Sequence, residues 1–278
     1  MGDLAMDTAV EPRGEGRFAA QLSQDWEIWG PNGGYLAGIA LRAAAASSAQ
    51  PVPASLTCHH LSVASFDPVE LEVVSLRATR RAESLRVTMW QQDKRIVESL
   101  VWLVTPGDGL LHDADTPPDV ADPDALPSLP ELLGAERRNP PSYRFWDNFE
   151  ARPLDWNGPF EQRPAGEPRV RNWYRYTPTA TFDDPVVDAI RSLILLDTMS
   201  WPAARRAHPP GPLPYVAPTL DVAVQFHRAA PASEWLLVEG VAPVAEQGLA
   251  AYSAKVWSRD RRLLASAAGQ MLCRPVPG

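Results

Sequence analysis

The chain of 278 residues has little cysteine, no long apolar run and no block of basic residues. Its two cysteines, Cys58 and Cys273, stand far apart in strand-like segments, which argues against a disulfide framework and favours free thiols in a reducing compartment. No segment approaches the roughly 18 unbroken apolar residues of a membrane helix, and the polar N-terminal stretch lacks the apolar core of a signal peptide. We therefore expect a soluble, cytoplasmic protein.

The sequence lacks the signature motifs of several functional classes. A net charge of -8 without a basic block argues against nucleic acid or an anionic membrane as partner. The chain contains no Gly-x-Ser-x-Gly elbow of a serine esterase and no glycine-rich phosphate loop, so neither that chemistry nor a nucleotide cofactor is expected. Cys58-His59-His60 has no second Cys/His group at zinc spacing, and neighbouring strand residues face opposite sides. We predict no metal and no cofactor.

One string of residues occurs twice. Trp90-Gln-Gln-Asp-Lys-Arg-Ile-Val-Glu-Ser99 matches Trp257-Ser-Arg-Asp-Arg-Arg-Leu-Leu-Ala-Ser266 in its Trp, Asp, Arg and Ser, at a constant offset of 167 residues. This period is much longer than the roughly 20 to 50 residues of a solenoid repeat. The repeat therefore indicates two fused copies of one module, and each string is predicted to form a turn between two strands.

A linker segment separates the two copies. From residue 106 to 141 the chain is acidic and rich in proline, which neither a helix nor a central strand tolerates. We predict an N-terminal module over residues 1–105, a linker over 106–141 and a C-terminal module over 142–278.

Each module has the same order of predicted elements. An aromatic segment precedes an alanine- and leucine-rich helix, and a series of strands rich in valine, leucine and tryptophan follows it. The helices are expected at about 35–48 and 185–206, and the strands at about 55–63, 69–80, 84–92, 95–104, 219–228, 235–245, 249–258 and 262–273.

Strand alternation favours one architecture. Leu220, Val222, Val224 and Phe226 share one face of the strand at 219–228, while the residues between them, Thr219 included, share the other. A curled antiparallel sheet that wraps around a long helix buries one such face. The fold class predicted is α+β, a double hotdog of two tandem modules.

The order of motifs resembles that of the bacterial type II acyl-CoA thioesterases. The similarity is carried by Leu193-Ile-Leu-Leu-Asp-Thr-Met-Ser-Trp-Pro202, Ala217-Pro-Thr-Leu-Asp221, Phe226-His-Arg228, Glu234-Trp-Leu-Leu237 and Leu264-Ala-Ser266, and in the first half by Asn32-Gly-Gly-Tyr-Leu. It extends over nearly the whole chain except the linker. The resemblance implies an acyl-CoA substrate and hydrolysis of its thioester.

The resemblance also implies catalytic residues. In that family a helix aspartate, a threonine that begins the next strand and a glutamine on the last strand bind and activate water. These roles fall on Asp197, Thr219 and Gln270. The register that aligns the last strand places Gly269 at the glutamine position and Gln270 one residue later, and such a slip turns a side chain to the opposite face unless a bulge corrects it.

The local pattern supports Asp197 independently. Helical spacing places it in an apolar stripe with Leu193, Ile194 and Trp201, where a carboxylate is costly to bury and has a raised pKa, as a general base requires. The alternative is a structural role, in which Asp197 caps the last helical turn or pairs with a nearby arginine.

Substrate contacts are predicted at four further positions. Gly33 and Gly34 open the first helix, where bare backbone amides can stabilise an oxyanion, although a tight turn explains a glycine pair equally well. His60 is predicted to line the pocket or to be structural. Arg175, close to two other arginines, could meet phosphates of coenzyme A, but a solvated strand face is the simpler explanation.

Three hypotheses follow for function. The first is an acyl-CoA thioesterase with one site per chain, carried by the second module and completed by the first. The second is a catalytically silent hotdog protein that binds acyl-CoA or lipid. The third, an enoyl-CoA hydratase, requires a histidine beside the helix aspartate, and the residues after Asp197 supply none. Hotdog modules pair through their sheets, so the two modules satisfy this within the chain or pair again in a homodimer.

Overall fold

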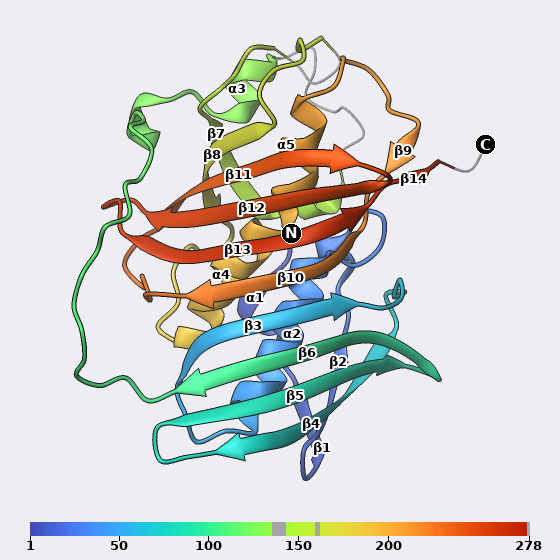
Figure 1. The fold of residues 1–278 in the computed structure, drawn as a ribbon, viewed down its shortest axis with the longest axis vertical. Coiled ribbons are helices and arrows are strands. Elements are labelled where there is room, and N and C mark those ends of the chain that lie inside the picture. Colours follow the sequence, from blue (N-terminus) through green and yellow to red (C-terminus); the bar gives the residue numbers. More distant parts are fainter. Residues whose placement is uncertain (135–142, 159–161, 277–278) are drawn as a thin grey trace.

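The strands of both modules form one antiparallel sheet. The computed structural model describes residues 1–134, 143–158 and 162–276, and in this part of the chain twelve strands follow the order β1-β2-β4-β5-β6-β3-β10-β13-β12-β11-β8-β7 (Figure 1). Their bounds are β1 Glu11–Gly14, β2 Arg17–Gln21, β3 Val52–His60, β4 Pro68–Ala78, β5 Ala82–Gln91, β6 Lys94–Val104, β7 Phe149–Pro153, β8 Arg169–Tyr176, β10 Thr219–Phe226, β11 Trp235–Glu246, β12 Leu249–Ser258 and β13 Leu263–Leu272. A separate pair consists of β9 Tyr215–Val216 and β14 Arg274–Pro275.

The two halves of the sheet are arranged alike. Read outward from the centre, β3, β6, β5, β4 and β2 of the first half match β10, β13, β12, β11 and β8 of the second. β3 and β10 meet antiparallel at the centre, with Cys58 opposite Val222 and Leu56 opposite Val224. The duplicated sequence thus produces a duplicated structure, and the halves are joined by backbone hydrogen bonds.

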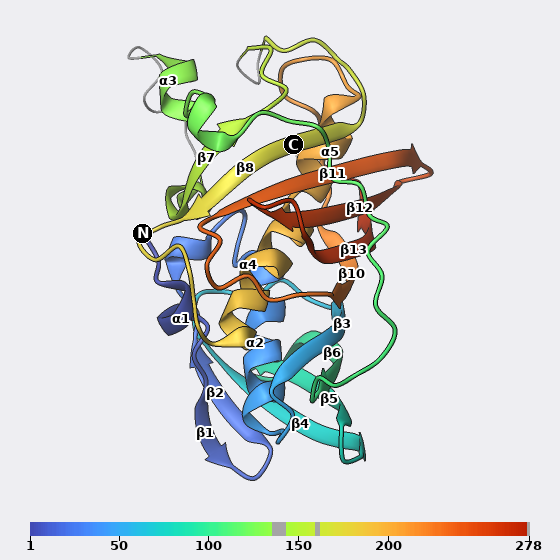
Figure 2. The same ribbon diagram turned by 90° about the vertical axis from the view of Figure 1, so that its left-hand side faces the viewer.

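Two central helices cover one face of the sheet. α2 (Gly33–Ala46) and α4 (Pro185–Thr198) lie side by side in the concave side of the sheet (Figure 2). They run antiparallel, since Gly38 of α2 adjoins Ile190 of α4 and Arg42 pairs with the N-cap Asp184 at 2.6 Å. This is the predicted double hotdog.

Short helices complete the described structure. They are α1 (Leu4–Asp7), α3 (Leu129–Leu133), α5 (Ser200–Arg206) and 3-10 turns at Gln24–Trp26, Pro123–Ala125 and Arg144–Asn148.

The helix predicted over residues 185–206 is broken in the structure. α4 ends at Thr198, Met199 forms a cap, and α5 begins at Ser200. Pro202 has no amide hydrogen with which to bond the Thr198 carbonyl four residues earlier, so the regular ladder is interrupted there. The break leaves Asp197 in the last turn of α4.

The aromatic segments contain strands that the sequence pattern did not predict. β2 includes part of the aromatic segment before the first helix. The aromatic residues before the second helix lie partly in β7 and β8. Trp26, fully buried, stacks on Tyr35 of α2 with ring centroids 5.5 Å apart. These aromatic side chains close the end of the core that the long strands leave open.

The repeated string forms the predicted turns. Gln92 between β5 and β6 and Arg261 between β12 and β13 both have left-handed backbone, with φ of 54° and 65°. In the first copy the Arg95 guanidinium lies 4.7 Å from the Trp90 ring centroid. In the second, Ser258 bonds Asp260.

The acidic linker crosses the second module as a strap. We name residues 113–124 the acidic strap; its carboxylates pair with basic residues at the ends of the strands. Asp113 meets Arg228 at 2.9 Å, Asp122 meets Arg259 at 2.7 Å, Asp119 meets Arg261 at 3.4 Å and Asp115 meets Lys255. Residues 135–141 of the predicted linker lie outside the described part of the chain. The predicted module boundaries therefore remain predictions.

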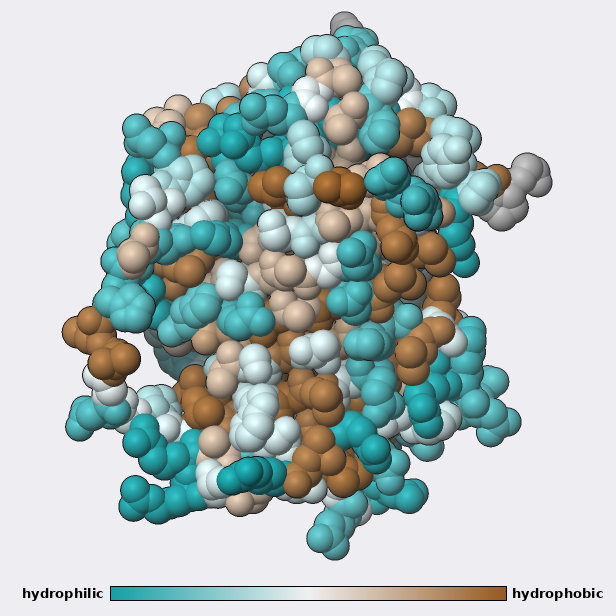
Figure 3. All heavy atoms as spheres, viewed as in Figure 1, coloured by the Kyte–Doolittle hydropathy of each residue, from teal (hydrophilic) through white to brown (hydrophobic). Residues whose placement is uncertain are grey.

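The outer face of the sheet is mixed in character. Figure 3 shows pale residues of nearly neutral to weakly hydrophobic character over the middle strands, with hydrophobic patches beside them and hydrophilic residues towards the edges. Ala223 of β10, Ala251 of β12 and the exposed Ala268 of β13 contribute to this area. None of the helices in the described residues has the length and apolar character that a membrane crossing needs.

One buried ion pair attaches α4 to the loop after β10. Arg191, 1% exposed, binds Asp188 and donates to the carbonyls of Ala180, Ala230 and Ser233. Asp188 in turn accepts from the Ala230 amide at 2.8 Å.

We predict that Arg191→Met lowers the free energy of unfolding by about 3–5 kcal/mol, because it leaves the Asp188 carboxylate buried without its cation. Urea unfolding followed by tryptophan fluorescence measures this. Arg13→Met is the control: its pair with Glu11 is exposed, so a change within about 1 kcal/mol is expected. Equal losses in the two variants would contradict the prediction.

Candidate active site

The two central helices approach each other closely where α2 begins and α4 ends. A Cβ added to Gly34 would lie 2.8 Å from the Ile194 Cα, so only glycine permits this crossing. A Cβ on Gly33 would lie 2.9 Å from Asp197 Oδ2 and 3.1 Å from the His60 ring. The glycine pair thus has a packing function, and it brings the start of α2 against a carboxylate.

Asp197 is the centre of the candidate site. Its side chain is buried, and Oδ2 accepts a hydrogen bond of 2.8 Å from the Gly34 amide. The positive end of the α2 dipole favours a carboxylate at this place. Oδ1 is buried and has no hydrogen-bond partner among the described residues. This oxygen is therefore available for a small molecule such as water.

Burial raises the pKa of Asp197 above its ordinary value. His60, the Gly34 amide and the Thr219 side chain lower it, in that order, without cancelling the effect of burial. The carboxylate is consequently a stronger base than an exposed aspartate, and it can take up a proton from a bound water.

His60 ends β3 and reaches the site from the first module. Its ring lies against Gly33, and Nε2 is buried without a hydrogen-bond partner in the described structure. Burial lowers the pKa of His60, while Asp197 and Asp221 act against this. The His60 ring and the Asp197 carboxylate thus both lie against Gly33.

Thr219 reaches Asp197 because of a β-bulge. Along β13, consecutive residues Met271 and Gln270 pair with Thr219 and Asp221, so Leu220 is an extra residue in β10. Leu220, predicted to share the buried face with Val222, is instead 37% exposed. The bulge reverses the alternation and turns Thr219 towards the helices, where it lowers the pKa of Asp197.

Gln270 does not join this group. It pairs with Asp221 of β10 and Ala251 of β12, while its neighbour Gly269 pairs with the buried Tyr252. Since directly opposed residues share a face and successive residues alternate, Gly269 faces the helices and Gln270 faces the opposite side of the sheet. Its Oε1 is nevertheless buried, with no hydrogen-bond partner among the described residues. The bulge lies in β10 rather than β13, so it leaves the Gln270 side chain on the outer face.

Arg175 is also placed elsewhere. It lies on β8 and pairs with Glu150 and, at 3.4 Å, with Glu234, and its guanidinium stands 5.1 Å from the Trp235 ring centroid. This arrangement agrees with the solvated strand face considered as the alternative.

The sequence reasoning missed Tyr252. This tyrosine of β12 is buried on the helix side of the sheet, where Asp197 affects its hydroxyl group electrostatically. Alternation along residues 249–258 could have placed it inward. No pattern in the sequence brings it near Asp197, because α4 and β12 are far apart in the chain.

The first module carries no matching carboxylate. α2 and α4 both have 14 residues, and the position of Asp197 near the end of α4 corresponds to Ala45 near the end of α2. Gly34 of the first module is instead the hydrogen-bond partner of Asp197. In the part of the chain that is described, no group of His, Cys, Asp and Glu side chains could hold a metal ion.

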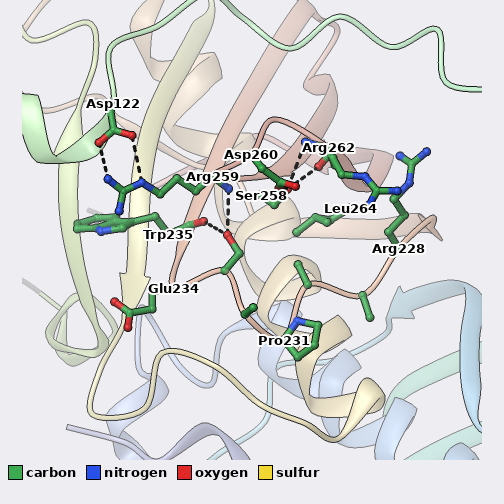
Figure 4. Close-up of a pocket in the computed structure, with 14 residues that line it drawn as sticks. Asp122, Arg228, Pro231, Glu234, Trp235, Ser258, Arg259, Asp260, Arg262 and Leu264 are labelled. Atoms are coloured by element: carbon green, nitrogen blue, oxygen red, sulfur yellow. Dashed lines mark hydrogen bonds and ion pairs between the residues drawn. The ribbon is translucent and has the colours of Figure 1, made fainter.

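The surface also has a groove that is separate from the candidate active site. It lies between the loop after β10 and the turn that follows β12, and is lined by Arg228, Trp235, Arg259 and Arg262 among others (Figure 4). Arg259 faces Asp122 of the acidic strap there. The groove adjoins the end of β10, whereas Thr219 begins that strand.

The raised pKa of Asp197 predicts a stability effect. A raised pKa in the folded state means that ionisation destabilises the fold, so stability falls as pH rises through that pKa. Asp197→Asn cannot ionise. We expect its melting temperature to exceed that of the unaltered protein at about pH 8 and the excess to shrink towards about pH 4.

Thermal unfolding at both pH values measures this difference. Asp155→Asn, which removes a carboxylate paired with Arg171 at 2.8 Å, is the control and should show no gain at the higher pH. An excess for Asp197→Asn that is independent of pH would contradict the predicted ionisation.

The chain is similar to known proteins along its whole length. Residues 22–104 match the acyl-CoA thioesterase N-terminal domain and residues 115–272 match the acyl-CoA thioesterase C-terminal domain. A TesB protein from Mycobacterium avium subsp. paratuberculosis is 25% identical with a TM-score of 0.75, and the match covers 98% of each chain.

Two further solved structures share the fold. An acyl-CoA thioesterase II, TesB2, from Mycobacterium marinum is 21% identical with a TM-score of 0.79, covering 99% of this chain and 100% of the other. A hot dog fold protein of unknown function from Alicyclobacillus acidocaldarius is 21% identical with a TM-score of 0.80, covering 99% of this chain and 98% of the other. With both domains matched in order over most of its length, the chain belongs to the acyl-CoA thioesterase family.

Proposed function

We propose that this thioesterase hydrolyses acyl-CoA with water that Asp197 activates. The observation that carries the proposal is the buried carboxylate of Asp197, fixed by the Gly34 amide through Oδ2 and left with Oδ1 unpaired within the described structure. Membership of the family supports the substrate class, and the contacts of Asp197 support its proposed role as the base.

The reaction is a nucleophilic substitution at the thioester carbon. Water bound at Oδ1 attacks this carbon while Asp197 takes up its proton, and a tetrahedral oxyanion forms. Collapse of the intermediate breaks the carbon–sulfur bond, and the proton on Asp197 passes to the departing sulfur. The products are a carboxylic acid and the free thiol of coenzyme A, and the enzyme returns to its initial state.

Three neighbouring residues support Asp197 in this proposal. Thr219 is turned inward by the bulge and orients the attacking water. His60 and Gly33 line the space in front of the carboxylate, where the thioester group would lie. The Gly34 amide positions the base, which differs from the oxyanion contact predicted from the sequence, because its hydrogen bond is already directed to Asp197.

A second candidate function is hydration of an enoyl-CoA. The sequence hypothesis lacked a histidine near Asp197, and the structure supplies His60 from β3, which the search along the helix could not find. The two functions give different products: a thioesterase releases the coenzyme A thiol, whereas a hydratase adds water and keeps the thioester intact.

Gln270 gives a reason to test for catalytic silence. A hotdog protein that only binds acyl-CoA would hold the substrate without releasing thiol. The outward position of Gln270 removes one of the predicted water ligands, so turnover must depend on Asp197, Thr219 and their other neighbours.

Assembly as a homodimer through the sheets also remains a prediction. The central part of the outer face, with Ala223 and Ala268, carries small residues that could lie against a second sheet (Figure 3).

We predict that Asp197→Asn lowers kcat for thiol release by about 100-fold or more, because the general base is lost. Saturated and unsaturated acyl-CoAs of several chain lengths are assayed for thiol release and for loss of the double bond. Asp155→Asn serves as the matched carboxylate control and should retain kcat.

The pH profile gives an independent check. Activity requires ionised Asp197, so kcat/KM of the unaltered enzyme should fall as pH drops through a pKa above the ordinary value of about 4. Full activity of Asp197→Asn would refute the proposed base. Binding of every acyl-CoA without turnover would establish the silent protein, and hydration without thiol release the hydratase.

A further inference from the structure

Tyr252 lies on the helix side of the sheet, the side that also carries the candidate site. It lies on β12 opposite Gly269 of β13, and Gly269 lies opposite Val222 of β10, next to Cys58 of β3. Opposed residues share a face, and Val222, Cys58 and Tyr252 are all buried on the helix side. The tyrosine side chain therefore lies on the helix side of the sheet, with its ring over Gly269 and its hydroxyl group near the Asp221 carbonyl oxygen.

Gly269 makes room for this ring. A Cβ at residue 269 would lie 2.8 Å from both Cε1 and Oη of Tyr252 and 2.1 Å from the Asp221 carbonyl oxygen. No larger residue fits there without displacing the tyrosine or the bulged strand. The glycine on the last strand is thus explained by the position of the phenol.

The hydroxyl group of Tyr252 has only a weak partner. It lies 3.4 Å from the Asp221 carbonyl oxygen, longer than the roughly 2.7–2.8 Å of a good hydroxyl bond. A buried hydroxyl without a strong hydrogen bond is costly, so this arrangement favours a function over a purely structural role.

The hydroxyl group of Tyr252 is protonated and can therefore donate a hydrogen bond. Burial, followed by the charges of Asp197 and Asp221, raises the pKa of Tyr252 well above its ordinary value. The phenol stays protonated across the physiological range. Asp197 Oδ1 and His60 Nε2 are both buried without partners in the described residues, so the site has polar atoms that a ligand can satisfy.

The proposed reaction requires a hydrogen-bond donor in addition to the Gly34 amide. Negative charge develops on the thioester oxygen, and removing one preorganised donor at such a site commonly reduces kcat by about 100- to 1,000-fold. The Gly34 amide is engaged by Asp197.

We propose that Tyr252 is a catalytic residue whose hydroxyl group donates a hydrogen bond to the thioester oxygen as the tetrahedral intermediate forms. The hydroxyl keeps its proton throughout, so the balance of the reaction is unchanged. The inference rests on the proposed hydrolysis at Asp197 and adds the group that stabilises the oxyanion.

The test is Tyr252→Phe, which removes one oxygen and little packing. We expect kcat for thiol release to fall about 100-fold, with KM within roughly twofold and a melting temperature close to that of the unaltered enzyme. Tyr176→Phe is the matched control. Tyr176 is equally buried in the same module and donates a 2.7 Å bond to the Arg191 carbonyl, so its loss should reduce stability and leave kcat unchanged.

A second pair of variants tests the inference if Tyr252→Phe does not fold. Tyr252→Gln keeps a donor and Tyr252→Met has similar length without one, so the glutamine variant should be faster. An unchanged kcat in Tyr252→Phe, or equal rates for the glutamine and methionine variants, would overturn the inference. Asp197→Asn separates the two failures: if it is inactive while Tyr252→Phe is fully active, the proposed base stands and only the role of Tyr252 is lost.

Discussion

The contact between the Gly34 amide and the Asp197 carboxylate is the interaction on which the site depends. It requires a buried charge, a helix start free of side chains and two helices whose backbones nearly touch. These conditions depend on one another. The glycine pair permits the close crossing of the helices, and this crossing buries Asp197. The Gly34 amide and the α2 dipole then compensate part of the free-energy cost of burying the carboxylate. The remaining cost appears as the raised pKa of Asp197.

The tandem architecture explains why there is one such contact in each chain. A twofold arrangement of equal modules would form two equivalent sites, one at each end of the antiparallel helix pair. Here the end of α2 carries Ala45, while the end of α4 carries Asp197. The start of α4 is occupied by its own capping residue, Asp184, which pairs with Arg42. The first module contributes Gly33, Gly34 and His60 to the surroundings of Asp197.

Irregularities in the strands determine which side chains reach the carboxylate. The extra residue Leu220 turns Thr219 inward, and the missing side chain of Gly269 admits Tyr252. Neither effect follows from ideal alternation, which would have left Thr219 on the outer face. Gln270 illustrates the opposite case, because its strand is regular there and keeps it away from Asp197.

The sequence by itself determined the duplication, the long helices and strands, and Asp197 as a buried carboxylate, because these depend on repeats and periodicities within short segments. The sequence also predicted that the glycine pair opens α2. Only the tertiary structure decided that Gly34 touches Asp197, that the His60 ring lies against Gly33 as Asp197 does, and that Tyr252 and Gln270 lie on opposite sides of the sheet. These contacts join residues far apart in the chain, and they depend on a helix crossing and a single bulge that local patterns do not encode.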